Sequence, residues 1–117
     1  MNELTKQHCV AVSANTPKLN QGEIEQYQAK LLGWKVYDNE GAPRLERAFK
    51  FDDFTQAVAF TNQVANLANE EDHHPAILTE WGKVTVTWWT HKIGGLHQND
   101  FVMAAKTSGL YKSMKGT

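Results

Sequence analysis

The chain has little of what marks several large classes of protein. Of its 117 residues, one is cysteine and three are proline, and its formal net charge at pH 7 is -1. The single cysteine, Cys9, excludes an internal disulfide, and no CxxC or HExxH spacing indicates a zinc site. No apolar run approaches the roughly 20 residues that a membrane-spanning helix requires. We therefore expect no structural disulfide and no membrane partner.

Two further absences bear on partners and location. Lysine and arginine are spread along the chain and form no basic stripe for a row of phosphates, so we expect no nucleic acid partner. The opening MNELTKQHCVAV lacks the cationic lead and the apolar stretch of a secretion signal. Together with the single cysteine, this favours a cytoplasmic protein.

The length and the 41% of hydrophobic residues are those of one ordinary globular domain. Residues 1–19 show no clear period and contain Pro17, which predicts an extended N-terminal segment with little function. Residues 20–117 are expected to form the single domain.

Three segments have the pattern of amphipathic helices, at residues 20–33, 53–72 and 100–111. The first begins with Asn20 and Glu23 at the spacing of a capping box. In the second, apolar residues recur at three- and four-residue intervals over its whole length. These patterns make the second helix the clearest element of the chain.

Two pairs of strands are expected between the helices, at residues 34–37 and 45–51 and at residues 77–81 and 84–90. The element order α-β-β-α-β-β-α predicts an α+β fold, with a four-stranded antiparallel sheet and three helices packed on one face. We further expect tryptophan and valine side chains on the outward face of the sheet, where copies of the chain can associate.

The stretch EEDHHPAILTEW, at residues 70–81, contains two of the five histidines. Pro75 forces His74 out of the helical conformation, so His73 and His74 lie where a helix passes to a strand, and His91 ends a later strand. Three interpretations are open: structural histidines, a metal site, or a pair that transfers protons. Adjacent histidines in extended backbone point apart, which disfavours a metal. Imidazoles on different elements can accept one proton and donate another near neutral pH.

Three tryptophans, Trp81, Trp88 and Trp89, follow the double histidine. Their rings can supply a flat apolar wall for an aromatic or heterocyclic substrate. For at least two of them, a place in the core or in an interface is the simpler interpretation.

The spacing of these residues closely resembles the signature of the pterin-4a-carbinolamine dehydratases. The resemblance rests on one set of positions: His73-His74-Pro75, Trp81, Thr90-His91, Gly95-Leu96 and Asp100. The runs FTNQVANLA and LTEWGKVTVTWWTH are similar to those of the bacterial members. The same order of elements extends from about residue 32 to residue 111, which is most of the chain.

The resemblance implies a cytoplasmic hydro-lyase. It would remove water from 4a-hydroxytetrahydropterin, the product left by an aromatic amino acid hydroxylase, and give quinonoid dihydropterin. The pterin is then the substrate, and no cofactor or metal is needed. The resemblance also implies a homodimer or homotetramer formed through sheet and helix surfaces, and a functional partnership with phenylalanine hydroxylase. A non-catalytic dimerisation or coactivator module is the alternative within the family, and a three-histidine metalloprotein is the alternative outside it.

By position in the family motif, His73 and His91 are implied acid–base groups. His74 is implied to hold the pterin, and Pro75 to fix the loop. Asp100 matches the motif's aspartate, but it also has a structural explanation, because an acidic third residue of a helix bonds back to the N-cap.

The chain departs from the family at one position. Asn69 stands four places before the first histidine, where the family usually has a charged residue. Our hypothesis is that Glu70 or Glu71 supplies the carboxylate, and the alternative is a solvated acidic patch. Trp81 and Thr90 complete the expected substrate-binding or supporting residues.

Overall fold

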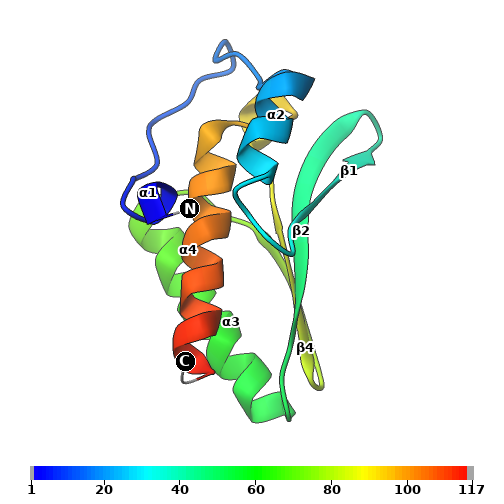
Figure 1. Cartoon of the computed structure of the whole chain (residues 1–117), viewed down its shortest axis with the longest axis vertical. Coiled ribbons are helices and arrows are strands. Elements are labelled where there is room, and N and C mark those ends of the chain that lie inside the picture. The colour runs from blue at the N-terminus through cyan, green and yellow to red at the C-terminus, as the bar shows by residue number, and fades with distance from the viewer. Residues whose placement is uncertain (1, 116–117) are drawn as a thin grey trace.

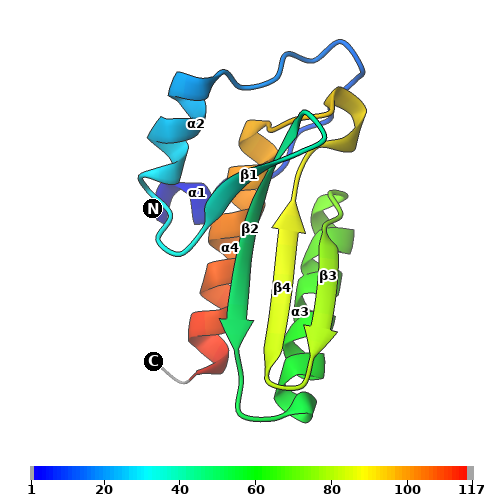
Figure 2. The ribbon, with the colours of Figure 1, turned by 90° about the vertical axis from the view of Figure 1, so that its right-hand side faces the viewer.

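The four strands arise from the two pairs of alternating segments. In the computed structural model, which describes residues 2–115, they are β1 (Lys35–Asn39), β2 (Ala42–Lys50), β3 (Ala76–Glu80) and β4 (Lys83–Trp88). All neighbours pair antiparallel, in the order β1-β2-β4-β3. The predicted antiparallel sheet is confirmed, and its two hairpins meet along β2 and β4 (Figure 2).

The predicted helices lie on one side of this sheet (Figure 1). They are α2 (Gln21–Gln28), α3 (Phe54–Glu71) and α4 (Gln98–Met114), and two short elements, α1 (Asn2–Thr5) and the 3-10 turn η1 (His91–Ile93), accompany them. Asn20 and Glu23 form the predicted capping box of α2. Within residues 2–115, none of the helices is both long and apolar enough to cross a membrane.

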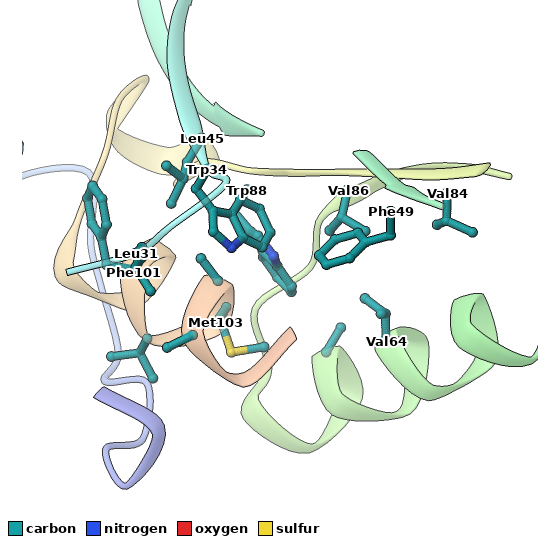
Figure 3. Packing of buried hydrophobic residues seen from close by; sticks show 14 of the residues in the cluster. Leu31, Trp34, Leu45, Phe49, Val64, Val84, Val86, Trp88, Phe101 and Met103 are labelled. Atoms are coloured by element: carbon teal, nitrogen blue, oxygen red, sulfur yellow. The ribbon is translucent and has the colours of Figure 1, made fainter. Parts of the chain in front are cut away.

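The core fills the space between the sheet and the helices (Figure 3). Trp88, Phe49 and Val86 face inward from the central strands and meet Val64 of α3 and Met103 of α4; each is at most 1% exposed. Burying one such side chain stabilises the fold by about 1.5–3 kcal/mol. This packing fixes the C-terminal end of α3 and the end of β4, which carry the histidines.

The expectation of outward-facing valines is wrong. Val84, Val86 and Trp88 are fully buried on the helix-covered face of β4. Successive residues of a strand point to opposite faces, so Thr85 and Thr87 take the outward side. The apolar set of the strand occupies the face that the helices cover, and on the other face Thr87, 6% exposed, donates to Glu46 Oε2 at 2.9 Å.

The N-terminal segment is not the loose lead-in expected from its composition. Residues 2–5 form α1, and Leu4, 3% exposed, belongs to the core. Further along, Leu19 N–H donates to the Leu96 carbonyl at 2.9 Å. These contacts are made one residue at a time to distant parts of the chain, so they leave no periodic pattern in the sequence.

Candidate active site

The double histidine lies on a turn that the local sequence dictates. Asp72 closes α3 in the left-handed conformation, with φ 52° and ψ 45°, which aspartate tolerates better than most residues. His73 N–H then donates to the Ala68 carbonyl at 3.1 Å, and Pro75 leads into β3. The turn places His73 inside, 9% exposed, and His74 outside.

A buried carboxylate stands directly behind His73. Asp100 is fully buried at the start of α4, and its Oδ1 lies 2.6 Å from His73 Nε2. Its Oδ2 accepts from Thr90 Oγ1 at 2.8 Å and from His97 N–H at 3.0 Å. An ionised carboxylate satisfies all three donors, which places the proton of neutral His73 on Nε2 and leaves Nδ1 as an acceptor.

Asp100 also has the structural role considered from the sequence. It is the third residue of α4 and completes a capping box with His97. Burial lowers the pKa of His97, and this outweighs the opposing effect of the Asp100 carboxylate. His97 Nδ1 accepts from Asn99 N–H at 3.0 Å, so the ring caps the helix in its neutral form.

His91 lies against the Trp89 ring, at an interplanar angle of 35°. The backbone before it is fixed by Thr90 N–H, which donates to the Gly95 carbonyl at 2.9 Å. The exposed His91 ring lies 4.3 Å from the Trp89 ring, and the Arg44 guanidinium lies 3.8 Å from the same indole. Trp89 is thus a support for His91, held in turn by a cation–π contact.

His74 has a neutral partner. Its Nε2 lies 3.1 Å from Asn69 Oδ1, so the amide oxygen accepts a hydrogen bond from the ring. Asn69, at the position where a charged residue was expected, therefore orients His74 without placing a charge beside it. The contact leaves His74 Nδ1 free to accept.

The two glutamates before the histidines do not reach the cleft. Glu70 is exposed. Glu71, with its side chain 9% exposed, accepts from Cys9 N–H at 2.8 Å and lies 2.8 Å from His8 Nδ1. Burial alone raises the pKa of Glu71, but these hydrogen bonds outweigh it and hold the pKa below its ordinary value. Its carboxylate is thus committed to the N-terminal segment.

A cleft of about 330 Å³ brings the histidines together. It is lined by Val10, Ala11, Val12, Asp72, His73, His74, Thr90, His91, Lys92 and Asn99. The three predicted histidines and Thr90 all reach it, with Asp100 behind His73. Its volume is at the small end of ligand pockets and suits a compact molecule of one or two rings.

Of the three tryptophans, none lines this cleft. Trp81 is 73% exposed at the far end of β3 from Pro75, and a strand of five residues spans roughly 16 Å. The expectation that Trp81 contacts the substrate therefore has no support from its position. Trp88 lies parallel to His73 instead, with ring centroids 5.8 Å apart and an interplanar angle of 7°.

Sequence reasoning missed six residues that line the cleft: Asp72, Lys92, Asn99, Val10, Ala11 and Val12. No local pattern distinguishes them, since most of them act through contacts with residues far along the chain. Within the described part of the chain, no three or more His, Cys, Asp and Glu side chains are gathered so that they could hold a metal ion.

The fold and the cleft define an α+β protein with a cleft lined by three histidines. A model of the pterin 4 alpha carbinolamine dehydratase family matches residues 17–110. A protein of Microcystis aeruginosa is 51% identical over 112 residues, covering 96% of this chain and 97% of its own. A protein of Marinobacter nauticus is 53% identical over 111 residues, which cover 95% of this chain and 100% of that protein. Both are provisionally named pterin-4-alpha-carbinolamine dehydratases, and this chain belongs to the pterin carbinolamine dehydratase family.

Solved structures share the fold. The crystal structure of a transcriptional coactivator/pterin dehydratase from Brucella melitensis matches with a TM-score of 0.74 and 33% identity, covering 81% of this chain and 99% of that one. A pterin dehydratase-like protein described as a RuBisCO assembly factor in the alpha-carboxysome matches with a TM-score of 0.58 and 25% sequence identity. The match covers 68% of this chain and 89% of that one. The predicted family and fold are thus confirmed, and the fold serves more than one function.

Proposed function

We propose that the protein is a hydro-lyase that converts 4a-hydroxytetrahydropterin to quinonoid dihydropterin and water. One observation carries the proposal beyond family membership. His73 is bound through Nε2 to buried Asp100 and shares one cleft with His74 and His91. Its Nδ1 has no partner among the described residues and is not enclosed by them, so it is the ring atom that a ligand in the cleft can reach.

The reaction needs one proton acceptor and one proton donor. The C4a–O bond breaks, and the hydroxyl group takes up a proton and leaves as water. The N5–H bond breaks as well, its proton goes to a base, and its electron pair forms the C4a=N5 double bond. No oxidant or reductant is consumed, so positioned acid–base groups are sufficient for the chemistry.

We assign the acceptor to His73 and the donor to His91. When His73 Nδ1 takes the N5 proton, the ring becomes an imidazolium, and the Asp100 carboxylate at 2.6 Å from Nε2 stabilises that charge. His91 is exposed and can regain from solvent the proton that it gives to the leaving hydroxyl. Asp100 acts through His73 and is a positioning residue.

His74 is assigned to binding. With Nε2 held by Asn69, its Nδ1 can accept a hydrogen bond from a polar edge of the pterin. The pterin is the substrate, and the reaction requires no other cofactor. We propose that the carbinolamine comes from an aromatic amino acid hydroxylase, with phenylalanine hydroxylation as the source, in the cytoplasm, and that the protein works as a homodimer or homotetramer.

The test is to generate the carbinolamine in situ with a phenylalanine hydroxylase and to follow its conversion to quinonoid dihydropterin by absorbance. The wild type should accelerate the conversion, and His73→Ala and His91→Ala should each lose most of that acceleration. Leu32→Ala, which truncates an 86% exposed side chain outside the cleft, is the matched control and should behave as the wild type. A wild type no faster than buffer would refute the proposal.

A second candidate is a partner-binding function. The two similar structures are those of a transcriptional coactivator/pterin dehydratase and of a pterin dehydratase-like RuBisCO assembly factor. In this chain, Leu78 and Trp81 are 59% and 73% exposed on β3 and its following turn, and exposed apolar residues are typical of interfaces. Gel filtration alongside the turnover assay separates the candidates, because a stable oligomer that turns over the carbinolamine favours the enzyme. An inert species that associates with another protein favours the module.

A further inference from the structure

Residues 8–12, here called the N-terminal strap, are fastened to the end of α3. Glu71 Oε1 accepts from Cys9 N–H at 2.8 Å, and Glu71 Oε2 lies 2.8 Å from His8 Nδ1. Since Glu71 is two positions before His73, this anchor ties the strap to the turn that carries the catalytic histidine.

A second anchor comes from the start of α4. The Asn99 side chain, in a residue 3% exposed, accepts from Val10 N–H at 3.0 Å and donates to the Val10 carbonyl at 2.8 Å. This is the two-bond pattern of a paired strand, made by one side chain. Asn99 directly precedes Asp100, so the strap is tied to both halves of the His73–Asp100 pair.

The third contact closes the strap over the loop that follows β4. Lys92 Nζ donates to the Val12 carbonyl at 3.3 Å, and Figure 2 shows the segment between α1 and α2 passing beside this loop. Val10, Ala11 and Val12 thereby line the same cleft as the histidines. The strap is one wall of the cleft.

The side chains of this wall, those of Val10, Ala11 and Val12, are hydrocarbon, and Val10 is 61% exposed. Both backbone polar groups of Val10, the N–H of Cys9 and the carbonyl of Val12 are already bonded to the protein. The pyrimidine edge of a pterin carries amide and amine groups that need hydrogen-bond partners, whereas the C6–C7 edge of the reduced ring carries only C–H groups and the C6 substituent. Desolvation therefore favours the C6–C7 edge against the strap.

We propose that Val10 and Val12 are specificity-determining residues that contact the C6–C7 edge and the C6 substituent of the substrate. Glu71 and Asn99 are the positioning residues that hold them in place. This inference rests on the proposed function. The family model matches residues 17–110 and so does not include the strap.

The first test compares KM and kcat for Val10→Ala and Val12→Ala. The substrate is the carbinolamine with a methyl group at C6. Each variant should raise KM about five-fold and leave kcat within two-fold, because the lost contact is made equally in the ground state and the transition state. With the more polar dihydroxypropyl group at C6, the rise in KM should be smaller. Val58→Ala makes the same change at a valine of α3 that lies outside the cleft, and it should alter neither parameter.

The second test releases the strap. Cys9 reports on its docking, because burial, with help from the nearby Glu71 charge, raises the pKa of its thiol to about 12 and makes it slow to alkylate. Glu71→Ala and Asn99→Ala should speed alkylation of Cys9 by iodoacetamide and raise KM at least as much as the valine variants do. Glu71→Gln can still accept from Cys9 N–H, so its Cys9 alkylation rate and its KM should both lie close to those of the wild type.

Several outcomes are decisive. If Glu71→Ala or Asn99→Ala speeds alkylation of Cys9 but leaves KM unchanged, release of the strap does not affect substrate binding, and the proposal is wrong. If the wild type is active and both valine variants have its KM, the proposal for the strap is wrong, but the proposed dehydratase activity is supported. The wild type could instead be inactive but bind a stable 7,8-dihydropterin in calorimetry, with weaker binding by both valine variants. That result would support the role of the strap and contradict the dehydratase activity. A wild type that shows no activity and no binding would contradict both proposals.

Discussion

Replacing Asp100 with asparagine should move the proton of the His73 ring from Nε2 to Nδ1, while the side chain at position 100 keeps its shape. Asp100 Oδ2 serves two donors, Thr90 Oγ1 and His97 N–H, whereas Oδ1 serves only His73. An amide keeps two of the three hydrogen bonds by placing its oxygen toward Thr90 and His97. Its NH₂ group then faces His73 Nε2, which must accept, so the proton moves to Nδ1. The proposed base is thereby blocked.

The magnitude follows from what is lost. General acid–base catalysis contributes about 10²–10⁴-fold, and the equivalent exchange in serine proteases lowers kcat about 10⁴-fold by the same change of tautomer. We expect Asp100→Asn to lower kcat at least 100-fold, down to the uncatalysed rate at the limit. All three hydrogen bonds to the charged carboxylate become hydrogen bonds to a neutral amide, so the free energy of unfolding should fall by about 1 kcal/mol for each bond, roughly 3 kcal/mol in all.

The assay is the decay of the carbinolamine under single-turnover conditions, with a thermal melt to show that the variant is folded. Nitrogen-15 NMR of the His73 ring reports the tautomer directly: the proton should be on Nε2 in the wild type and on Nδ1 in Asp100→Asn. Asp53→Asn is the matched control, since Asp53 also accepts from a helix N–H, that of Gln56 at 2.8 Å, but at the start of α3. A folded Asp100→Asn with kcat within three-fold of the wild type would refute the reasoning.

Three further predictions follow from the same contacts. His91→Ala should lower kcat about 10²-fold without changing Tm, because its ring is exposed; a matching loss of Tm would contradict this. Cys9, whose thiol pKa burial raises to about 12, should react with iodoacetamide at pH 8 at least ten times more slowly in the folded than in the urea-unfolded protein; equal rates would count against the buried strap. Burial lowers the pKa of His97 from 6.5, so the unfolded chain binds this proton more readily, and stability should fall as pH drops below about 6.5. Urea midpoints at pH 5 and pH 8 test this, with His97→Gln as a variant that should lose part of the difference.

The features predictable from the sequence were those with local causes. The capping pair of Asn20 and Glu23, the apolar period of α3 and the alternation in the strands each follow from neighbours a few residues apart. Pro75 placed the double histidine at the turn between α3 and β3 for the same reason. The order of elements then determined the antiparallel sheet.

The features that escaped prediction depend on contacts between distant residues. Glu71 was considered as a catalytic carboxylate, and only the folded chain shows that it binds residues 62 and 63 positions away. Trp81 was assigned because it follows the double histidine and matches a position of the family signature, but the strand between it and Pro75 separates the two residues. The choice between the faces of β4 was also ambiguous from alternation, because the period gives two faces and does not say which one the helices cover.

The most direct test of the account is the rate at which the double variant His73→Ala/His91→Ala converts the carbinolamine, measured beside the wild type. If the two histidines are the proton acceptor and donor, the wild type accelerates the conversion, and the folded double variant proceeds at the rate of buffer alone. Acceleration that survives in the double variant, or that is missing in the wild type, would contradict the assignment of this cleft as a dehydratase site.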